Sequence, residues 1–235
     1  MGKRWIPVVR LLSVAALVCS AGAARAQTAT AADASSGGGS GDWTATAART
    51  VPAGQNVMQV EAGWPGVNLA FLHGETSKSD IGARLSFLYG FEGTTRTIAG
   101  VQFQVPYRRL LGAGDFASIA VHVDPGFTVY GNNADRGGTE VGIGGPIGLV
   151  AGFRADSRLT LEAGVDFPIL LSFIHPLGLF FGPQLGGGAE YLIDRNLAVT
   201  FRARFGPNFA LANGDTSTRF AFSSLVGLAF NFNTR

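Results

Sequence analysis

Apolar and polar residues alternate along most of this chain, from Gln55 to Phe232, and turns interrupt the alternation at nearly regular intervals. A period of two residues is that of a β-strand whose two faces meet different environments. One phase is apolar, whereas the other is rich in glycine, arginine, glutamate and glutamine. Strands of about ten residues with this pattern are typical of a barrel with lipid outside and a polar interior.

We therefore expect an all-β fold, a closed antiparallel up-and-down transmembrane β-barrel of about 8 to 10 strands. The strand count depends on Trp64-Pro65-Gly66. If these residues form a hairpin turn, the barrel has ten strands, an even number, which we favour. If they form only a kink, the first two strands merge and the count is nine, which single-chain bacterial barrels avoid. The main alternative has about eight, with the N-terminal runs partly unpaired. The strands are expected at 56–63, 67–73, 80–89, 97–108, 117–130, 138–154, 158–170, 180–192, 196–208 and 219–232.

The N-terminus has the order of a secretory signal peptide. Basic residues lie ahead of the apolar stretch 11–18, and Ala24-Arg25-Ala26 follows it. Signal peptidase recognises small residues spaced in this way, so we expect residues 1–26 to be removed. A spanning helix is the alternative, but the apolar stretch is shorter than the ~20 residues that a bilayer requires.

Residues 27–54 are mostly Ala, Thr, Ser and Gly. They include too few large apolar side chains to offset the entropy lost on ordering, so we expect a flexible periplasmic leader. The barrel then occupies residues 55–235.

Charge and cysteine content exclude several classes of function. Residues 1–26 carry Lys3, Arg4, Arg10 and Arg25, so their removal leaves 14 of the 18 basic residues against 16 acidic ones, a net charge near −2. A nucleic-acid partner is therefore not expected. The one cysteine, Cys19, lies within the predicted signal peptide, which leaves the mature chain without disulfide or thiol chemistry.

Charged residues of the predicted strands fall on the phase opposite to the apolar one. Ions inside a narrow barrel are partly desolvated and should pair with one another, which favours a plugged lumen over an open pore. The predicted lumen charge network consists of Glu61, Arg84, Arg108, Asp124, Arg154, Glu162, Asp166, Glu190, Arg202 and Arg204.

Proline cannot donate a ladder hydrogen bond, so prolines should mark places where strand pairing ends. We expect a ring of prolines near the outer rim, with the chain beyond it above the membrane. Its members are Pro125, Pro146, Pro168, Pro183 and Pro207, whereas Pro106 does not fit this rule.

With these features, residues 55–232 resemble the small outer-membrane β-barrels of Gram-negative bacteria, the group that includes outer-membrane protein A and the eight-stranded outer-membrane protein X. The resemblance implies a membrane anchor, an adhesin or a narrow pore that the outer-membrane assembly machinery inserts. It also implies a last strand that ends in an aromatic residue, and Phe230 and Phe232 have the required phase.

The sequence contains few candidate catalytic or metal-binding residues. Ser118, His122 and Asp124 share the inward face of one strand, but same-face neighbours lie ~6.5 to 7 Å apart, too far for a nucleophile to bond to its base. His73 and His175 lie on other elements, without metal-ligand spacing. We expect no catalytic residue, no metal and no cofactor.

An apolar stretch, residues 169–181, lies beyond Pro168, where an exposed loop should be polar. Such a patch usually marks a contact surface. Alternatively, the two flanking strands extend further than expected. The candidate contact residues are Phe173, Ile174, His175, Leu177, Leu179 and Phe180.

The sequence predicts an integral barrel of a Gram-negative outer membrane, not an enzyme, with a plugged lumen and a structural or surface-interaction role. Its expected partners are membrane lipid, lipopolysaccharide and the assembly machinery. The first alternative is a narrow pore for ions or small solutes. A lipid-modifying barrel enzyme and a soluble barrel with its apolar face inward are less favoured.

Overall fold

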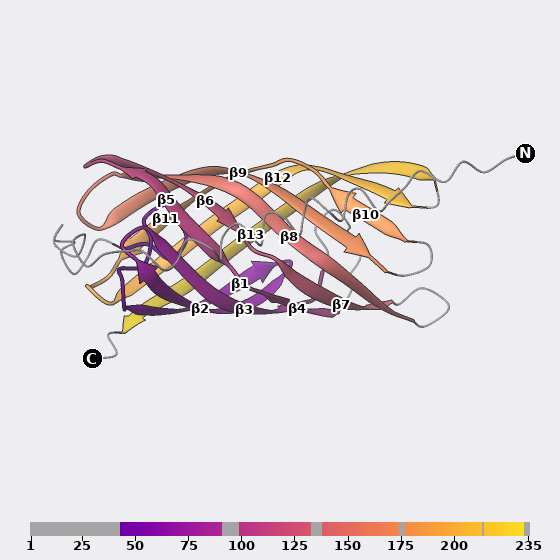
Figure 1. Ribbon diagram of the computed structural model, residues 1–235, viewed down its shortest axis with the longest axis horizontal. Coiled ribbons are helices and arrows are strands. Elements are labelled where there is room, and N and C mark those ends of the chain that lie inside the picture. Colours follow the sequence, from indigo (N-terminus) through magenta and orange to yellow (C-terminus); the bar gives the residue numbers. More distant parts are fainter. Residues whose placement is uncertain (1–42, 91–98, 133–137, 174–176, 213, 233–235) are drawn as a thin grey trace, which may run out of the picture. The chain divides into compact units, whose positions relative to one another are not determined.

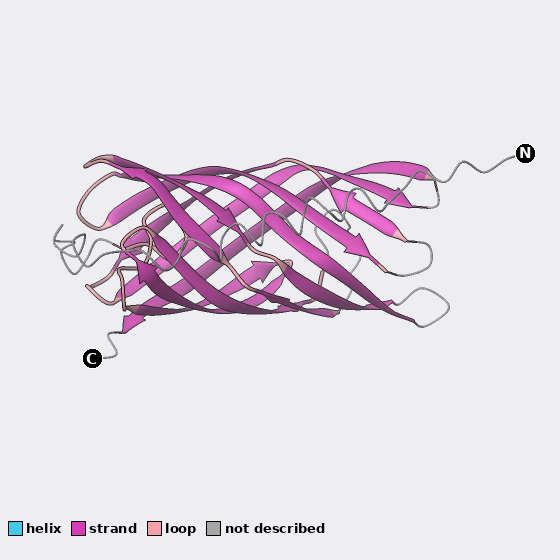
Figure 2. Cartoon of the chain, in the orientation of Figure 1, coloured by secondary structure: helices cyan, strands magenta, loops and turns pink. Residues whose placement is uncertain are grey.

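The computed structural model of this chain describes residues 43–90, 99–132, 138–173, 177–212 and 214–232 (Figure 1). These residues belong to one compact unit, Gly38–Arg235. The predicted signal peptide and residues 27–42 of the predicted leader lie outside the described residues. Within the described ranges the chain consists of strands and loops (Figure 2), and no helix there is long and apolar enough to cross a bilayer.

The strand segments form a single antiparallel sheet that closes on itself, because β13 pairs with β1 as well as with β12. Three pairs of segments, β4 with β5, β6 with β7 and β10 with β11, are each one strand with an interruption, so the barrel has ten strands. The segments are β1 (Asn56–Trp64), β2 (Gly66–Thr76), β3 (Ser79–Leu88), β4 (Gly100–Gln104), β5 (Tyr107–Ala113), β6 (Ala117–Val123), β7 (Gly126–Asn132), β8 (Gly138–Arg154), β9 (Leu159–Ser172), β10 (Gly178–Phe181), β11 (Gln184–Leu192), β12 (Leu197–Ala212) and β13 (Asp215–Phe232).

The strand count confirms the prediction of ten. β1 ends at Trp64 and β2 begins at Gly66, so Pro65 forms the turn of a hairpin. The strands that close the barrel, β1 and β13, pair from Asn56 opposite Phe232 to Trp64 opposite Ser224. A closed sheet has no edge strand with unpaired backbone groups, which is a condition for crossing lipid.

We call the end of the barrel with the turns at 155–158 and 193–196 the inner end, and the opposite end, where β12 and β13 meet at Ala212 and Asp215, the outer end. In Figure 1 the inner end, where β13 finishes, is on the left. Aspartates shape both inner turns: Asp156 Oδ1 accepts the N–H groups of Arg158 and Leu159, and Asp194 repeats the arrangement. These bonds to the charged form lower the pKa of Asp156.

The prolines form a belt, but not at the rim. Pro146 lies opposite Pro168 within the paired strands β8 and β9, so pairing continues on both sides of them. Proline lacks only the donor, and its carbonyl still accepts: Pro125 O accepts the N–H of Val105, and Pro146 O that of Asp124. The three strand interruptions each contain a proline, and Pro106, which did not fit the predicted rule, is one of them.

The exterior of the barrel is apolar. On β13, Val226, Leu228 and Phe230 are 55, 53 and 47% exposed and alternate with buried residues. Of the charged residues within the strands, Glu75 and Arg109 are exposed on the outward phase. Both lie close to the inner end, on β2 and β5, where a long side chain reaches the head-group region.

Replacing Leu228 with Arg should lower the free energy of unfolding in lipid vesicles by about 2 to 4 kcal/mol, because the charge would lie in the hydrocarbon layer. The same substitution at Leu111, which is exposed near the inner end of β5, should cost about 1 kcal/mol or less. Denaturant titration of both variants measures the difference. Equal small costs would contradict a lipid-facing exterior.

Candidate functional site in the barrel lumen

Three ion pairs between arginines and buried carboxylates cross the middle of the lumen. Each pair joins residues from different strands, so the network links the wall across the interior. The pairs are Arg84 with Asp124 at 2.8 Å, Arg202 with Glu61, and Arg204 with Asp166 at 2.9 Å. Buried charges require such partners, because unpaired ions lose their hydration without compensation.

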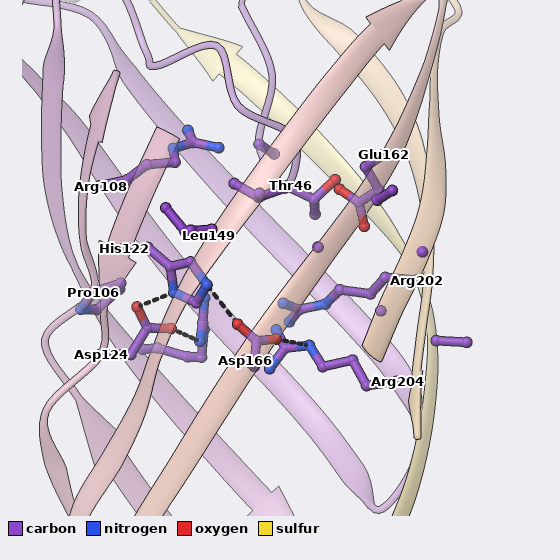
Figure 3. A pocket seen from close by; sticks show the side chains of 18 of the residues that line it. Thr46, Pro106, Arg108, His122, Asp124, Leu149, Glu162, Asp166, Arg202 and Arg204 are labelled. Carbon is purple, nitrogen blue, oxygen red and sulfur yellow. Dashed lines mark hydrogen bonds and ion pairs between the residues drawn. The ribbon is translucent and has the colours of Figure 1, made fainter. Parts of the chain in front are cut away.

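His122 connects two of these pairs (Figure 3). Its Nε2 lies 2.6 Å from Asp166 Oδ1, and its Nδ1 lies 3.4 Å from Asp124 Oδ1. Gly148 leaves the space for this contact, since a Cβ there would lie 2.1 Å from the Asp166 carboxylate. The imidazole is thus held between two carboxylates from β9 and from the junction of β6 and β7.

The candidate hydrolase group does not assemble. Ser118 Oγ donates to the carbonyl of Gly152 at 3.4 Å, and both nitrogens of His122 face carboxylates. Among the described residues, no cluster of His, Cys, Asp and Glu could hold a metal ion. His73 bonds to Asn56, and His175 lies outside the described residues.

Residues 43–51, which we call the plug segment, lie in the lumen at the inner end. The plug segment has no helix or strand, but it is ordered against the wall. Trp43 is 2% exposed, and Ala47, Ala48 and Val51 are fully buried. Trp43 Nε1 donates to the carbonyl of Arg195 in an inner turn, which places one end of the segment at the inner mouth.

Glu190, on β11, is the main carboxylate that holds the plug segment. Its Oε2 accepts the N–H groups of Ala45 at 2.9 Å and Thr46 at 3.2 Å, together with the Thr46 hydroxyl at 3.2 Å. Glu190 is 2% exposed. A buried carboxylate therefore takes its hydrogen bonds from the main chain of the plug segment, and these charge-assisted bonds are the strong ones.

Arg108 and Asp80 form a second anchor. Their side chains pair at 2.6 Å, and both also bind the plug segment. Arg108 donates to the carbonyls of Thr44 and Ala47, while Asp80 Oδ2 accepts the N–H of Val51 at 2.9 Å. The ion pair thus satisfies polar main-chain atoms along most of the segment.

The prediction of a flexible leader does not describe residues 43–51. That prediction considered large apolar side chains as the source of order. Instead, charged side chains of the wall bind the main chain, and small residues let the segment fit. A Cβ at Gly152 would lie 3.4 Å from Ala47 Cβ and 3.3 Å from Ala48 N, so the wall approaches the plug segment closely.

The remaining predicted lumen charges differ in their surroundings. Glu162 lies beside Thr46 (Figure 3), and its Oε1 would be 2.4 Å from a Cβ at Gly188. Arg154 lies at the inner end of β8, where it is half-buried. Asp80 was absent from the predicted network, although it begins the expected strand 80–89 on the same phase as Arg84. The alternation was therefore a signal that could have placed it in the lumen.

Within the apolar stretch 169–181, residues 169–172 pair with residues 178–181. Leu171 lies opposite Leu179 and Phe180 opposite Leu170, so the strands extend further, which was the alternative interpretation. Phe180 was expected at a surface contact, but it lines a cavity in the lumen. Phe173 and Leu177 are 52 and 49% exposed, and for them a surface contact stays a prediction. Ile174 and His175 lie outside the described residues.

An inner and an outer cavity lie in the lumen, and Arg84, Arg202 and Arg204 line both. The inner cavity, of about 80 Å³, lies between the plug segment and the ion pairs. The outer cavity, of about 150 Å³, lies on the other side of the three arginines and extends to Pro65. The arrangement can bind small polar molecules, but it leaves no wide channel among the described residues.

The barrel is similar to solved outer-membrane barrels. The outer membrane protease OmpT of Escherichia coli has a TM-score of 0.45 at 10% identity, over 76% of this chain and 93% of that chain. OmpT, an outer membrane protein of Vibrio cholerae, has a TM-score of 0.36 at 14% identity, over 77% and 62%. A KdgM porin in complex with disordered oligogalacturonate has a TM-score of 0.36 at 11% identity, over 76% and 99%. No family model and no curated protein sequence matches the chain.

The prediction that the chain is not an enzyme is withdrawn. One similar barrel is an outer membrane protease, and at 10% identity the comparison neither assigns nor excludes an activity. A fold does not determine an activity, and this likeness assigns no catalytic residue to the chain. The resemblance to outer-membrane proteins A and X holds for the class of barrel; the strand number, ten, differs from the eight of protein X.

Replacing Glu190 with Gln should loosen the plug segment, because charge-assisted bonds to Ala45 and Thr46 are worth about 1.5 to 3 kcal/mol. We expect amide hydrogen exchange in residues 43–51 to become roughly 10 to 100 times faster. Mass spectrometry of the corresponding peptides measures the rate.

The matched control is Asp166→Asn, the same chemical change at a carboxylate that contacts His122 and Arg204 instead of the plug segment. In this variant, amide hydrogen exchange in residues 43–51 should be unchanged. If both variants gave the unmodified exchange rate, Glu190 would not be an anchor.

Proposed function

We propose that this protein is an integral barrel of a Gram-negative outer membrane whose lumen is closed by its own plug segment. The observation that carries this proposal is the burial of residues 43–51 against Glu190, Asp80 and Arg108. Because the lumen is closed, the two ends and the exterior of the barrel are the surfaces available for contact with other molecules. The role that fits best is structural or a surface interaction at the outer end.

Membrane insertion is supported by the distribution of side chains. The exterior carries apolar residues such as Phe87 and Phe201, which are 54 and 44% exposed, while Glu61 inside is 1% exposed. In water this arrangement would expose a large continuous apolar surface. Lipid and lipopolysaccharide are therefore the proposed surroundings, and the predicted signal peptide is consistent with export and insertion by the assembly machinery.

A narrow pore is the second candidate. The observation in its favour is that the same three arginines line the inner and the outer cavity, so side chains, not main chain, separate the two spaces. Movement of the plug segment would extend the inner cavity to the inner mouth. The two candidates differ in whether the resting protein conducts.

Single-channel recording in planar bilayers separates them. The unmodified protein should show no steady conductance, and deletion of residues 43–51 should produce one, because the deletion removes the main chain that fills the inner end. Glu190→Gln should give brief openings. Glu75→Gln removes an exposed carboxylate near the inner end of β2 and should stay closed.

A steady conductance in the unmodified protein, unchanged by the deletion, would refute the closed lumen and favour the pore. Absence of conductance in a folded deletion variant would show that the ion pairs alone close the barrel, which also contradicts the assignment of closure to the plug segment.

A further inference from the structure

The charged side chains that line the outer cavity all have the same sign. Its charged lining residues are Arg84, Arg202 and Arg204, and no carboxylate lines it among the described residues. Two of the carboxylate partners, Asp124 and Asp166, line the inner cavity instead. Arg84 and Arg204 therefore have their acids on the inner side, whereas Glu61, the partner of Arg202, lines neither cavity. The three arginines are the charged residues that a molecule in the outer cavity would meet.

The inner cavity carries charges of both signs. Asp80 and Glu162 line it together with the two aspartates, and Arg108 and His122 line it beside the three arginines. Charges of one sign in a low-dielectric cleft focus the potential at its opening. A molecule that enters from the outer end therefore meets positive charge first, and this arrangement favours an anion.

The guanidinium groups retain donors for such an anion. A guanidinium has five N–H donors, and Arg204 binds Asp166 through Nε, which is one of them. The side chain of Arg204 keeps 21% of its surface exposed, and that of Arg84 keeps 13%. Arginine binds carboxylates and other oxyanions through paired N–H groups, so these are suitable partners.

The rest of the lining is amide and apolar. Gln102 and Asn208 represent the amides, while Phe180 and Leu170 form part of an apolar wall. Asn208 Oδ1 is buried and has no hydrogen-bond partner among the described residues. Buried polar atoms without a partner call for an explanation, such as a bound molecule. The amide offers a donor or an acceptor to whatever occupies the cavity.

Size and lining together define a ligand class. A cavity of about 150 Å³ is comparable to engineered cavities that bind benzene. We propose that the outer cavity binds a small organic carboxylate, with its carboxylate toward Arg84, Arg202 and Arg204 and its apolar part against Phe180 and Leu170. This site does not depend on whether the plug segment closes the lumen.

Benzoate is a suitable probe, because it combines an apolar ring with one carboxylate, and benzamide is its neutral counterpart. Calorimetric titration of the folded full chain in detergent, at constant ionic strength, should show benzoate binding at least tenfold tighter than benzamide. Equal affinities, or no detectable benzoate binding, would overturn the proposal without the need for any variant.

A variant tests the location. Gln102→Glu adds a negative charge to the outer cavity but keeps the contact with Thr128, whose hydroxyl can donate to the new carboxylate. Benzoate affinity should fall at least tenfold, while benzamide affinity stays the same. Asn196→Asp makes the corresponding change in an exposed inner turn and should have no effect on either ligand.

Benzoate affinity unchanged in a folded Gln102→Glu protein, or reduced to the same extent by Asn196→Asp, would place the binding elsewhere. Comparison of heated and unheated samples by electrophoresis establishes that each variant is folded.

Discussion

The structure depends on one constraint: a closed cylinder with an apolar exterior has to satisfy its ionised groups from within. Glu190 and Asp80 are each 2% exposed, and lipid offers them no hydrogen-bond partner. The wall supplies some partners as ion pairs. The plug segment supplies others, because its main-chain N–H groups bind both carboxylates and its carbonyls accept from Arg108. The plug segment and the wall charges therefore stabilise each other.

This reciprocity explains why a segment of small residues is ordered. Each of Ala47 and Ala48 contributes little apolar area, so burial of side chains alone would not offset the entropy of fixing the main chain. Charge-assisted hydrogen bonds in a low-dielectric lumen are stronger than those in water. Small side chains are required in the plug segment, because the wall comes close to the segment at Gly152.

Alternation along the strands was sufficient to predict the barrel and the outward phase of residues such as Leu228, since a two-residue period depends only on local sequence. The hairpin at Pro65 was favoured for another reason, because it gives an even number of strands. Partners across the lumen are long-range and have no local signal. His122 lies 44 positions from Asp166 and Glu190 144 positions from Thr46. The proline rule failed for a different reason: it treated the missing donor at Pro146 as the end of pairing, although the carbonyl continues to accept.

In the proposed function, a closed inner end and an arginine-lined outer cavity give the two ends of the barrel different properties. The inner half gathers the carboxylates that bind the plug segment, and the outer half presents Arg84, Arg202 and Arg204. Function at the outer end can thus proceed without transport through the lumen. This division follows from the same ion pairs that stabilise the barrel.

The most direct test of the plug segment is an engineered disulfide. A Cβ at Gly152 would lie 3.4 Å from Ala47 Cβ, close to the separation of about 3.5 to 4.5 Å found in disulfides. With Cys19 changed to Ser, the pair Ala47→Cys and Gly152→Cys should form a disulfide in the folded barrel. The control pair is Ala47→Cys with Gly112→Cys, because a Cβ added at Gly112 would contact nothing within 4 Å. Free thiols in both pairs would mean that the segment does not occupy the lumen.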